Sequence, residues 1–356
     1  MKKHNYSAGP CVLPQEVFQQ AAAAVLEFEN TGLSILEISH RSKEFIAVME
    51  EARALSLELL GLTGKGYQAL FLQGGASLEF LMVPYNLMKV GGKAAYLDTG
   101  AWSGKALKEA KGVGETVVVA SSKDKNYNYI PKNYAIPADV DYLHITSNNT
   151  IFGTQVKDFP KTDVFLVSDM SSDIFSRQLD FSQFDLIYAG AQKNMGPAGT
   201  TLVVVKEDIL GKSGRTIPAM LDYQIHIANE SMYNTPAVYA VYVSLLNLRW
   251  LKNLGGIPAI EKINEHKAQL LYNEIDRNPL FTGTCEVEDR SPMNVCFLLK
   301  DDAHKETFDK LWKAANISGI NGHRSVGGYR ASMYNALAVE SVQALVDCMK
   351  ELENKI

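Results

Sequence analysis

One lysine lies in a segment where ordinary surface lysines are seldom found. Residues 189–199 separate the apolar runs 186–188 and 200–205, which we expect to be two strands joined by a tight turn around Lys193. The neighbouring residues are small, glycines allow close backbone approach, and Pro197 stiffens the turn. A lysine held in this way can be desolvated, which lowers its pKa and makes its amine a nucleophile able to form a Schiff base. From these residues alone, a lysine that only closes a hairpin is an equally good interpretation.

A carboxylate precedes this segment at the end of another expected strand. Residues 164–172 read as a buried strand, and Asp169 lies near its C-terminal end. In open α/β sheets, ligands bind beyond the carboxyl ends of the strands. Pyridoxal phosphate requires a lysine for its aldehyde and a carboxylate for its ring nitrogen. Lys193 and Asp169 together therefore favour this cofactor.

A glycine turn supplies a candidate phosphate site. Residues 68–73 read as a strand, 74–77 as a sharp turn, and Leu78 begins an apolar helix. Free N–H groups and the positive end of a helix dipole attract an anion at such a place. Glycine turns often join strands to helices without any ligand. Beside a reactive lysine, the backbone of Ala76 and Ser77 becomes a candidate for phosphate contacts.

Cationic side chains gather near the C-terminus without acidic neighbours. His323, Arg324 and Arg330 lie within eight residues, and no Asp or Glu occurs between Gly319 and Val339. Arginine is suited to gripping a carboxylate or phosphate with its planar fork. A solvated basic loop is the alternative. A second pair, His40 and Arg41, follows an apolar run that we expect to be extended, and such a pair is more often surface than ligand.

Three stretches of the chain resemble the phosphoserine aminotransferases, a class V family of fold-type I pyridoxal phosphate enzymes. They are residues 6–10, residues 169–172 together with 187–199, and residues 322–335, so the likeness covers nearly the whole chain. The resemblance implies an α/β fold, with a mainly parallel seven-stranded sheet flanked by helices and a smaller α+β C-terminal domain. With a boundary at the glycines near residue 255, we expect an N-terminal segment at the active-site mouth (1–14), a large cofactor-binding domain (15–255) and a small domain (256–356).

The resemblance also assigns site residues. It implies that Lys193 holds pyridoxal 5'-phosphate and transfers the proton, that Asp169 pairs with the ring nitrogen, and that Trp102, otherwise an ordinary core residue, stacks on the ring. The remaining cofactor contacts that it implies are Ala76, Ser77, Thr150, Gln192, Asn234 and Thr235. Arg330 would bind the α-carboxylate of the substrate. The distal phosphate or carboxylate would be held by His40, Arg41, His323 and Arg324.

Asn234 and Thr235 carry a prediction about assembly. In the resembled family they reach the cofactor phosphate of the other subunit, which implies a homodimer. A local interpretation needs no partner, because Asn-Thr-Pro is typical of a helix start with Thr235 as the cap and Pro236 in the first turn.

The implied reaction is reversible transamination of 3-phosphohydroxypyruvate with L-glutamate, giving O-phospho-L-serine and 2-oxoglutarate in serine biosynthesis. A parallel reaction in pyridoxine biosynthesis, giving 4-phosphooxy-L-threonine, stays open. A rival within the fold is cysteine desulfuration, for which Cys285 is a weak candidate. A rival of another class is a cofactor-binding regulator, but the chain has no segment left over for a recognition module.

Composition excludes other classes. A formal net charge of −5 gives no basic surface for nucleic acid. No apolar run approaches the ~20 residues of a membrane helix, and the N-terminus lacks the apolar core of a signal peptide. Four scattered cysteines support neither a disulfide framework nor a metal site. We therefore expect a cytoplasmic enzyme without membrane contact.

Overall fold

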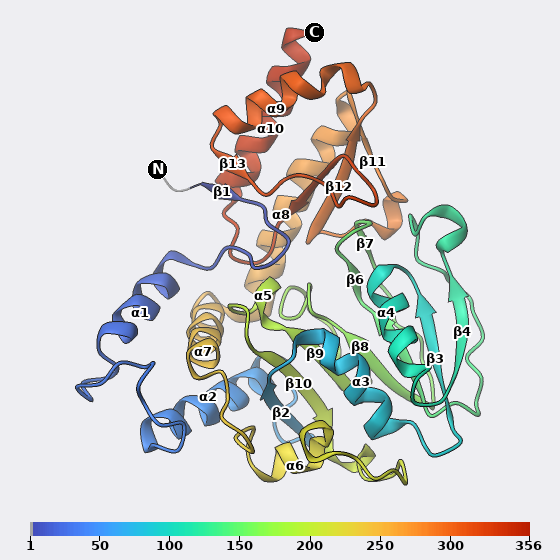
Figure 1. Cartoon of the computed structure of the whole chain (residues 1–356). Coiled ribbons are helices and arrows are strands. Elements are labelled where there is room, and N and C mark those ends of the chain that lie inside the picture. Colours follow the sequence, from blue (N-terminus) through green and yellow to red (C-terminus); the bar gives the residue numbers. More distant parts are fainter. Residues whose placement is uncertain (1–2) are drawn as a thin grey trace.

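A seven-stranded sheet forms the centre of the protein (Figure 1). The computed structural model describes residues 3–356, so Met1 and Lys2, with which the expected N-terminal segment begins, lie outside the described residues. The strand order is β2-β10-β9-β8-β5-β3-β4, and only β10 runs antiparallel to its neighbours. The predicted mainly parallel sheet is confirmed. Its strands are β2 (Tyr67–Leu72), β3 (Lys93–Asp98), β4 (Glu115–Ser121), β5 (Tyr142–Thr146), β8 (Phe165–Asp169), β9 (Leu186–Gly190) and β10 (Thr201–Lys206).

Helices cover both faces of this sheet because its strand residues alternate between two apolar cores. In β10, Leu202 and Val204 join the core beneath α2 and α7, whereas Val203 and Val205 join the core beneath α3 and α4. The first face is covered by α1 (Gln15–Leu26), α2 (Lys43–Leu59) and α7 (Val238–Asn253). The second face is covered by α3 (Gly75–Leu87), α4 (Ala101–Ala110) and α6 (Tyr223–Ala228).

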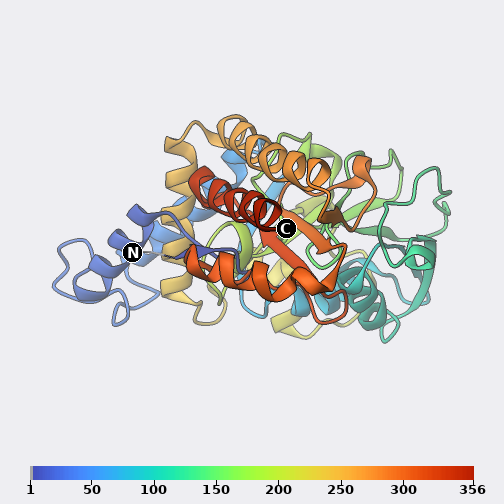
Figure 2. The same cartoon turned by 90° about the horizontal axis from the view of Figure 1, so that it is seen from above.

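The C-terminal part builds a separate apolar core on a small antiparallel sheet, β11-β12-β14. Figure 2 shows its three long helices side by side across the top of the molecule. The first of these helices, α8 (Gly256–Arg277), contributes side chains to two apolar cores. Ile257 and Ile260 pack in the core of the large sheet, whereas Leu271 and Ile275 pack in the core of the small sheet. The elements are α8 (Gly256–Arg277), β11 (Phe281–Gly283), β12 (Asn294–Leu299), α9 (Lys305–Ala314), β14 (Tyr329–Ser332) and α10 (Val339–Lys355).

The N-terminal strand β1 (His4–Asn5) belongs spatially to this C-terminal part. It pairs in parallel with β13 (Ile317–Ser318), and Tyr6 is buried in the small core. A hairpin of β6 (Asn148–Asn149) and β7 (Thr154–Gln155) lies at the carboxyl end of β5. The division into 1–14, 15–255 and 256–356 stays a prediction.

Three local predictions are wrong. The connection between β9 and β10 contains a helical turn, α5 (Ala191–Asn194), and Lys193 lies on it. Thr235 does not cap α7, which begins two residues after Pro236 with Ala237 as an N-cap that makes no side-chain bond. The carbonyl of Thr235 instead accepts from Gln73. The run before His40 forms turns rather than an extended segment.

Candidate active site

Asp169 and Lys193 meet at the edge where the parallel strands β5, β8 and β9 end. Asp169 is the last residue of β8 and is 5% exposed. One of its carboxylate oxygens accepts from the Ser171 N–H at 2.9 Å, and hydrogen bonding from the Ser171 side chain also lowers the pKa of this carboxylate. Burial raises the pKa of Asp169 and lowers the pKa of Lys193, while each charge partly offsets the shift of the other. Burial of the amine therefore favours its neutral form, which is the form that acts as a nucleophile.

A second carboxylate, which the sequence analysis missed, lies behind this pair. The hydroxyl of Ser147 lies 2.9 Å from the Asp169 carbonyl oxygen and also contacts the carboxylate of Asp173. Arg177 pairs with Asp173 at 3.2 Å. The sequence signal for this ion pair was the spacing of four residues between Asp173 and Arg177. These contacts fix the end of β8 and so the direction of Asp169.

Thr150 joins two residues that are far apart in the chain. The indole Nε1 of Trp102 donates to the Thr150 hydroxyl at 3.2 Å, and Arg330 donates to the Thr150 carbonyl at 3.2 Å. The Nζ of Lys193 lies 5.0 Å from the centre of the Trp102 ring. The buried Nε of Arg330 has no hydrogen-bond partner. The aromatic ring, the reactive amine and an unsatisfied guanidinium donor therefore surround one space.

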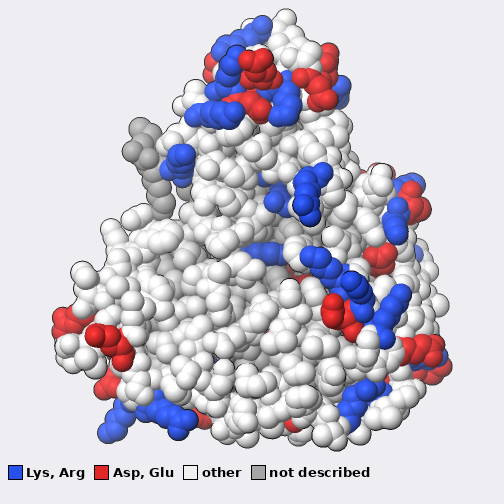
Figure 3. Space-filling model, in the orientation of Figure 1, with Lys and Arg blue, Asp and Glu red and all other residues white. Residues whose placement is uncertain are grey.

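His323 and Arg324 lie on the loop between β13 and β14, which continues into Arg330. The Nδ1 of His323 lies 2.7 Å from the Ser325 hydroxyl. Partial burial lowers the pKa of His323, and the charges of Arg330, Arg324 and Lys105 lower it further. Figure 3 shows Lys and Arg side chains on both sides of a hollow beneath the C-terminal part. Uncompensated positive charge of this kind favours an anionic ligand.

The glycine turn has the geometry of an anion site. Gly74 adopts φ +103°, and a Cβ there would lie 2.5 Å from the Cβ of Leu78, so the turn requires glycine. The helix α3 then begins at Gly75, which places the N–H groups of Ala76 and Ser77 in its first turn. These groups are available to a phosphate.

Asn234 and Thr235 lie next to this turn in the same chain. The amide of Asn234 donates to the Gln73 side chain at 3.1 Å, and Gln73 donates to the Thr235 carbonyl at 3.4 Å. Gln73 directly precedes Gly74. Both residues therefore border the start of α3 before any second subunit is considered.

Two of the predicted residues, His40 and Arg41, lie apart from this group, whereas Gln192 directly precedes Lys193 on α5. His40 and Arg41 contact each other at 3.4 Å in the α1–α2 connection, and within residues 3–356 no bond joins them to the rest of the predicted site. In Figure 1 this connection lies on the far left, away from α4. Gln192 is turned toward the N-terminal segment: its carbonyl accepts from the Cys11 N–H at 3.1 Å, and its side chain packs against Gly9.

Buried polar residues connect the Arg330 strand to the lysine helix, and the sequence analysis did not predict these contacts. The Asn335 N–H donates to the Asn194 side chain at 2.9 Å, next to Lys193. The fully buried Lys267 donates to the carbonyls of Met333 and Tyr334 at 3.1 and 2.9 Å. The signal for Lys267 was a lysine at a buried position of the helix α8.

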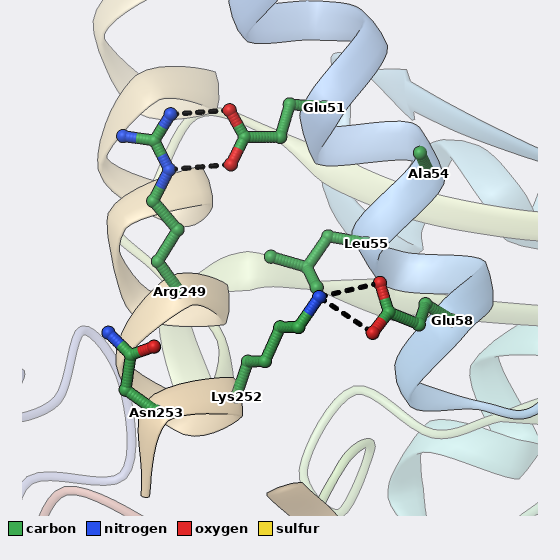
Figure 4. Close-up of a pocket in the computed structure, with 7 residues that line it drawn as sticks. All are labelled: Glu51, Ala54, Leu55, Glu58, Arg249, Lys252 and Asn253. Carbon is green, nitrogen blue, oxygen red and sulfur yellow. Dashed lines mark hydrogen bonds and ion pairs between the residues drawn. The ribbon is translucent and has the colours of Figure 1, made fainter.

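A groove between α2 and α7 provides a contrast (Figure 4). Its volume is about 320 Å³, and its charged side chains pair with one another, Arg249 with Glu51 and Lys252 with Glu58. With these charges already neutralised, the groove offers a ligand no free ionic partner. The space around Lys193 differs because its cations lack such partners.

The site fits pyridoxal phosphate on the residues present. The buried carboxylate of Asp169 suits a protonated ring nitrogen, a flat indole suits the ring, and N–H groups at the start of α3 suit the phosphate. No group of three His, Cys, Asp or Glu side chains that could hold a metal occurs in the described part of the chain. Over the same part, no helix is both long and apolar enough to cross a membrane.

Comparisons with known proteins agree with this arrangement. The family model of class-V aminotransferases matches residues 4–345. The chain is 74% identical to the phosphoserine aminotransferase of Flavobacterium psychrophilum over the full length of both. It is 56% identical to the Bacteroides thetaiotaomicron protein of the same name over 99% of each.

Solved structures give the same result. A phosphoserine aminotransferase from Bacillus circulans subsp. alkalophilus superposes with a TM-score of 0.96 at 45% identity, over 99% of each chain. The pyridoxal phosphate-bound phosphoserine aminotransferase of Trichomonas vaginalis gives a TM-score of 0.93 at 35% identity, over 98% of this chain and 100% of that one.

Proposed function

The chain belongs to the class-V aminotransferases, within the phosphoserine aminotransferase family, and from this premise we propose the reaction that it catalyses. It transfers the amino group of L-glutamate to 3-phosphohydroxypyruvate, giving O-phospho-L-serine and 2-oxoglutarate. The observation that supports this substrate pair is the group of cations near Lys193. Arg330 has an unsatisfied buried donor, and neither Arg324 nor Lys105 has a carboxylate partner in the part of the chain that the structure describes.

The cofactor is pyridoxal phosphate, which when bound withdraws electrons from the substrate carbon that loses its proton. Lys193 would hold the cofactor through its desolvated amine. When free, the same amine would accept the proton of the substrate α-carbon and give it back. Its lowered pKa makes the neutral amine, which is the form that accepts the proton, accessible.

Asp169 and Trp102 orient the cofactor. The Asp169 carboxylate would pair with the ring nitrogen, and its main-chain carbonyl accepts a hydrogen bond from Ser147. Trp102 would stack on the ring, and its indole is held in one orientation by Thr150. Ala76 and Ser77 offer N–H groups to the phosphate.

Arg330 binds the α-carboxylate that every amino-acid substrate carries, because its fork suits a carboxylate. His323 and Arg324 bind the distal group, which is a phosphate in one substrate and a carboxylate in the other. A cluster of cations accommodates both, whereas a single fixed arginine would match one geometry only.

We further propose that the active protein is a homodimer. His40 and Arg41 are remote from the cation cluster within one chain, so they reach a distal anion only if a second copy brings them there. Asn234 and Thr235, which contact Gln73 within their own chain, are proposed from the family resemblance to complete the phosphate site of the other subunit. Four free cysteines without a described disulfide fit the cytoplasm as the proposed compartment.

Absorbance spectroscopy tests the reaction. The purified protein is expected to show a visible band that bleaches with L-glutamate and returns with 3-phosphohydroxypyruvate. A band that glutamate leaves unchanged would contradict the reaction but not the cofactor. Absence of the band after adding pyridoxal phosphate would contradict the role of Lys193.

The rival reaction, cysteine desulfuration, needs a reactive thiolate. Burial raises the pKa of Cys285 to about 11 and that of Cys11 and Cys296 to about 12, so these thiols stay protonated at neutral pH. Sulfide release from cysteine that depends on Cys285 would overturn this conclusion. A competition assay between 3-phosphohydroxypyruvate and the longer phosphorylated keto acid of pyridoxine biosynthesis would measure which of the two substrates the enzyme prefers.

A further inference from the structure

The helix α4 carries a lysine to which no part of the substrate has yet been assigned. Lys105 lies one helical turn after Trp102, and its Nζ is 4.4 Å from the centre of the Trp102 ring. The side chain is exposed, and no acidic residue among residues 3–356 pairs with it. An exposed lysine that packs on an aromatic ring gains little stability from that contact. Its placement therefore requires an argument from its surroundings.

Lys105 lies near the cation cluster, which consists of His323, Arg324 and Arg330. Thr150 connects Trp102, on the same helix as Lys105, to Arg330 on β14. The positive charge of Lys105 also reaches His323 on the β13–β14 loop and helps to lower the pKa of that imidazole. The helix α4 thus faces the loop across the hollow whose two sides carry Lys and Arg side chains in Figure 3.

We propose that Lys105 is a specificity-determining residue, which binds the distal phosphate of the substrate from the α4 side, opposite His323 and Arg324. This inference rests on the proposed function. An anion between the two sides relieves the repulsion among cations that have no acidic partner. Lys105 discriminates by charge, since the distal phosphate carries close to two negative charges above pH 7, whereas the γ-carboxylate of glutamate carries one.

The charge difference sets the size of the effect. For an exposed pair about 6 Å apart in water, removing a unit charge weakens binding of a monoanion about threefold, by Coulomb's law. The same removal weakens binding of a dianion about tenfold, which is the square of the first factor. Both factors shrink toward one as salt screens the charges.

The experiment compares two ligands that do not react. Calorimetry on the cofactor-loaded protein at pH 8 and low salt measures the Kd of 3-phosphoglycerate, with a distal dianion, and of glutarate, with a distal monoanion. Lys105→Gln is expected to raise the first Kd about tenfold and the second about threefold. Lys105→Arg is expected to restore both. Lys108→Gln, one turn further along the exposed face of α4, is the matched control and should change neither.

Steady-state kinetics supplies the second measurement. Lys105→Gln should raise KM for 3-phosphohydroxypyruvate and leave kcat near its original value, because Lys105 is remote from the proton that moves. Equal losses for the two ligands would overturn the proposal and leave Lys105 as packing for Trp102. No loss for either ligand would exclude contact with the distal group.

The two levels of inference fail separately. A wild-type protein that does not turn over 3-phosphohydroxypyruvate contradicts the proposed function. The ratio of the two Kd changes tests Lys105 without any turnover.

Discussion

The buried amine of Lys267 should make the stability of the protein depend on pH. Its side chain is fully buried, and its hydrogen bonds go to two main-chain carbonyls rather than to a carboxylate. Burial lowers the pKa of Lys267 to about 7, against about 10.4 in an unfolded chain. Between these values the unfolded chain binds one more proton than the folded chain. The free energy of unfolding therefore rises with pH, by about 1.4 kcal/mol per pH unit from this group.

Lys267→Met removes this titration and keeps most of the apolar volume. At pH 9 the variant should be less stable than wild type by about 2–4 kcal/mol, because two buried carbonyls lose their donor. At pH 7.5 the deficit should be smaller by about 2 kcal/mol, since folded wild type then bears the cost of holding a lysine without its proton. At pH 7.5 the free energy of unfolding of the variant should therefore be closer to that of wild type than at pH 9, or should exceed it.

Urea unfolding at pH 7.5 and 9, at one protein and one cofactor concentration, measures this difference. Lys262→Met, at an exposed position of the same helix, is the control and should give a difference that does not vary with pH. A gap between wild type and Lys267→Met that is constant or narrows as pH rises would refute the reasoning. The amine would then be protonated in the fold and stabilised by something other than the two carbonyls.

Three further changes test the site and its frame. Lys193→Ala should abolish both the visible band and turnover, and retention of full activity would remove the central assignment. Arg330→Ala should raise KM for every amino-acid substrate, whereas Arg324→Ala should raise KM mainly for the phosphorylated substrates. The opposite pattern would mean that Arg324 binds the α-carboxylate and Arg330 binds the distal group. Gly196→Ala should destabilise the protein by about 1–3 kcal/mol in urea unfolding, because the new Cβ would lie 2.2 Å from a hydroxyl on α7. Gly104→Ala, where a Cβ meets nothing within 4 Å, should not destabilise it.

The sheet and the two central residues could be predicted because each depends on local sequence. Apolar runs with short polar ends predict buried strands, and the carboxyl ends of parallel strands lie at one edge. Asp169 and Lys193 therefore had to lie near each other if their strands were neighbours, and β8 and β9 are neighbours. The lysine's local conformation was predicted less well, because the ten residues (191–200) that connect the antiparallel strands β9 and β10 can close as a turn or include one turn of helix, as they do in α5.

Contacts between distant parts of the chain were not predictable in this way. Asn335 and Asn194 are 141 residues apart, and neither carries a local signal that names the other. Thr150 was placed at the cofactor by resemblance, but its position between Trp102 and Arg330 follows only from the fold.

The role proposed for Lys105 could not be predicted from the sequence, for a physical reason. In sequence it is one of several lysines on the solvated face of an amphipathic helix, and such lysines are usually unremarkable. Its neighbours in space, an indole and a cationic loop from the other end of the chain, distinguish it from Lys108. Only the fold, which brings α4 near the β13–β14 loop, provides that information.

The buried contacts around β14 imply that substrate binding and the position of the reactive lysine are coupled. Arg330 on β14 binds the α-carboxylate in our proposal, and residues 333–335 directly after β14 are held by Lys267 and by Asn194. Because Asn194 directly follows Lys193, a shift of β14 would change the position of the Lys193 amine relative to the substrate α-carbon. With a pKa of about 7, Lys267 is present in both protonation forms near neutral pH, and either form can donate to the two carbonyls.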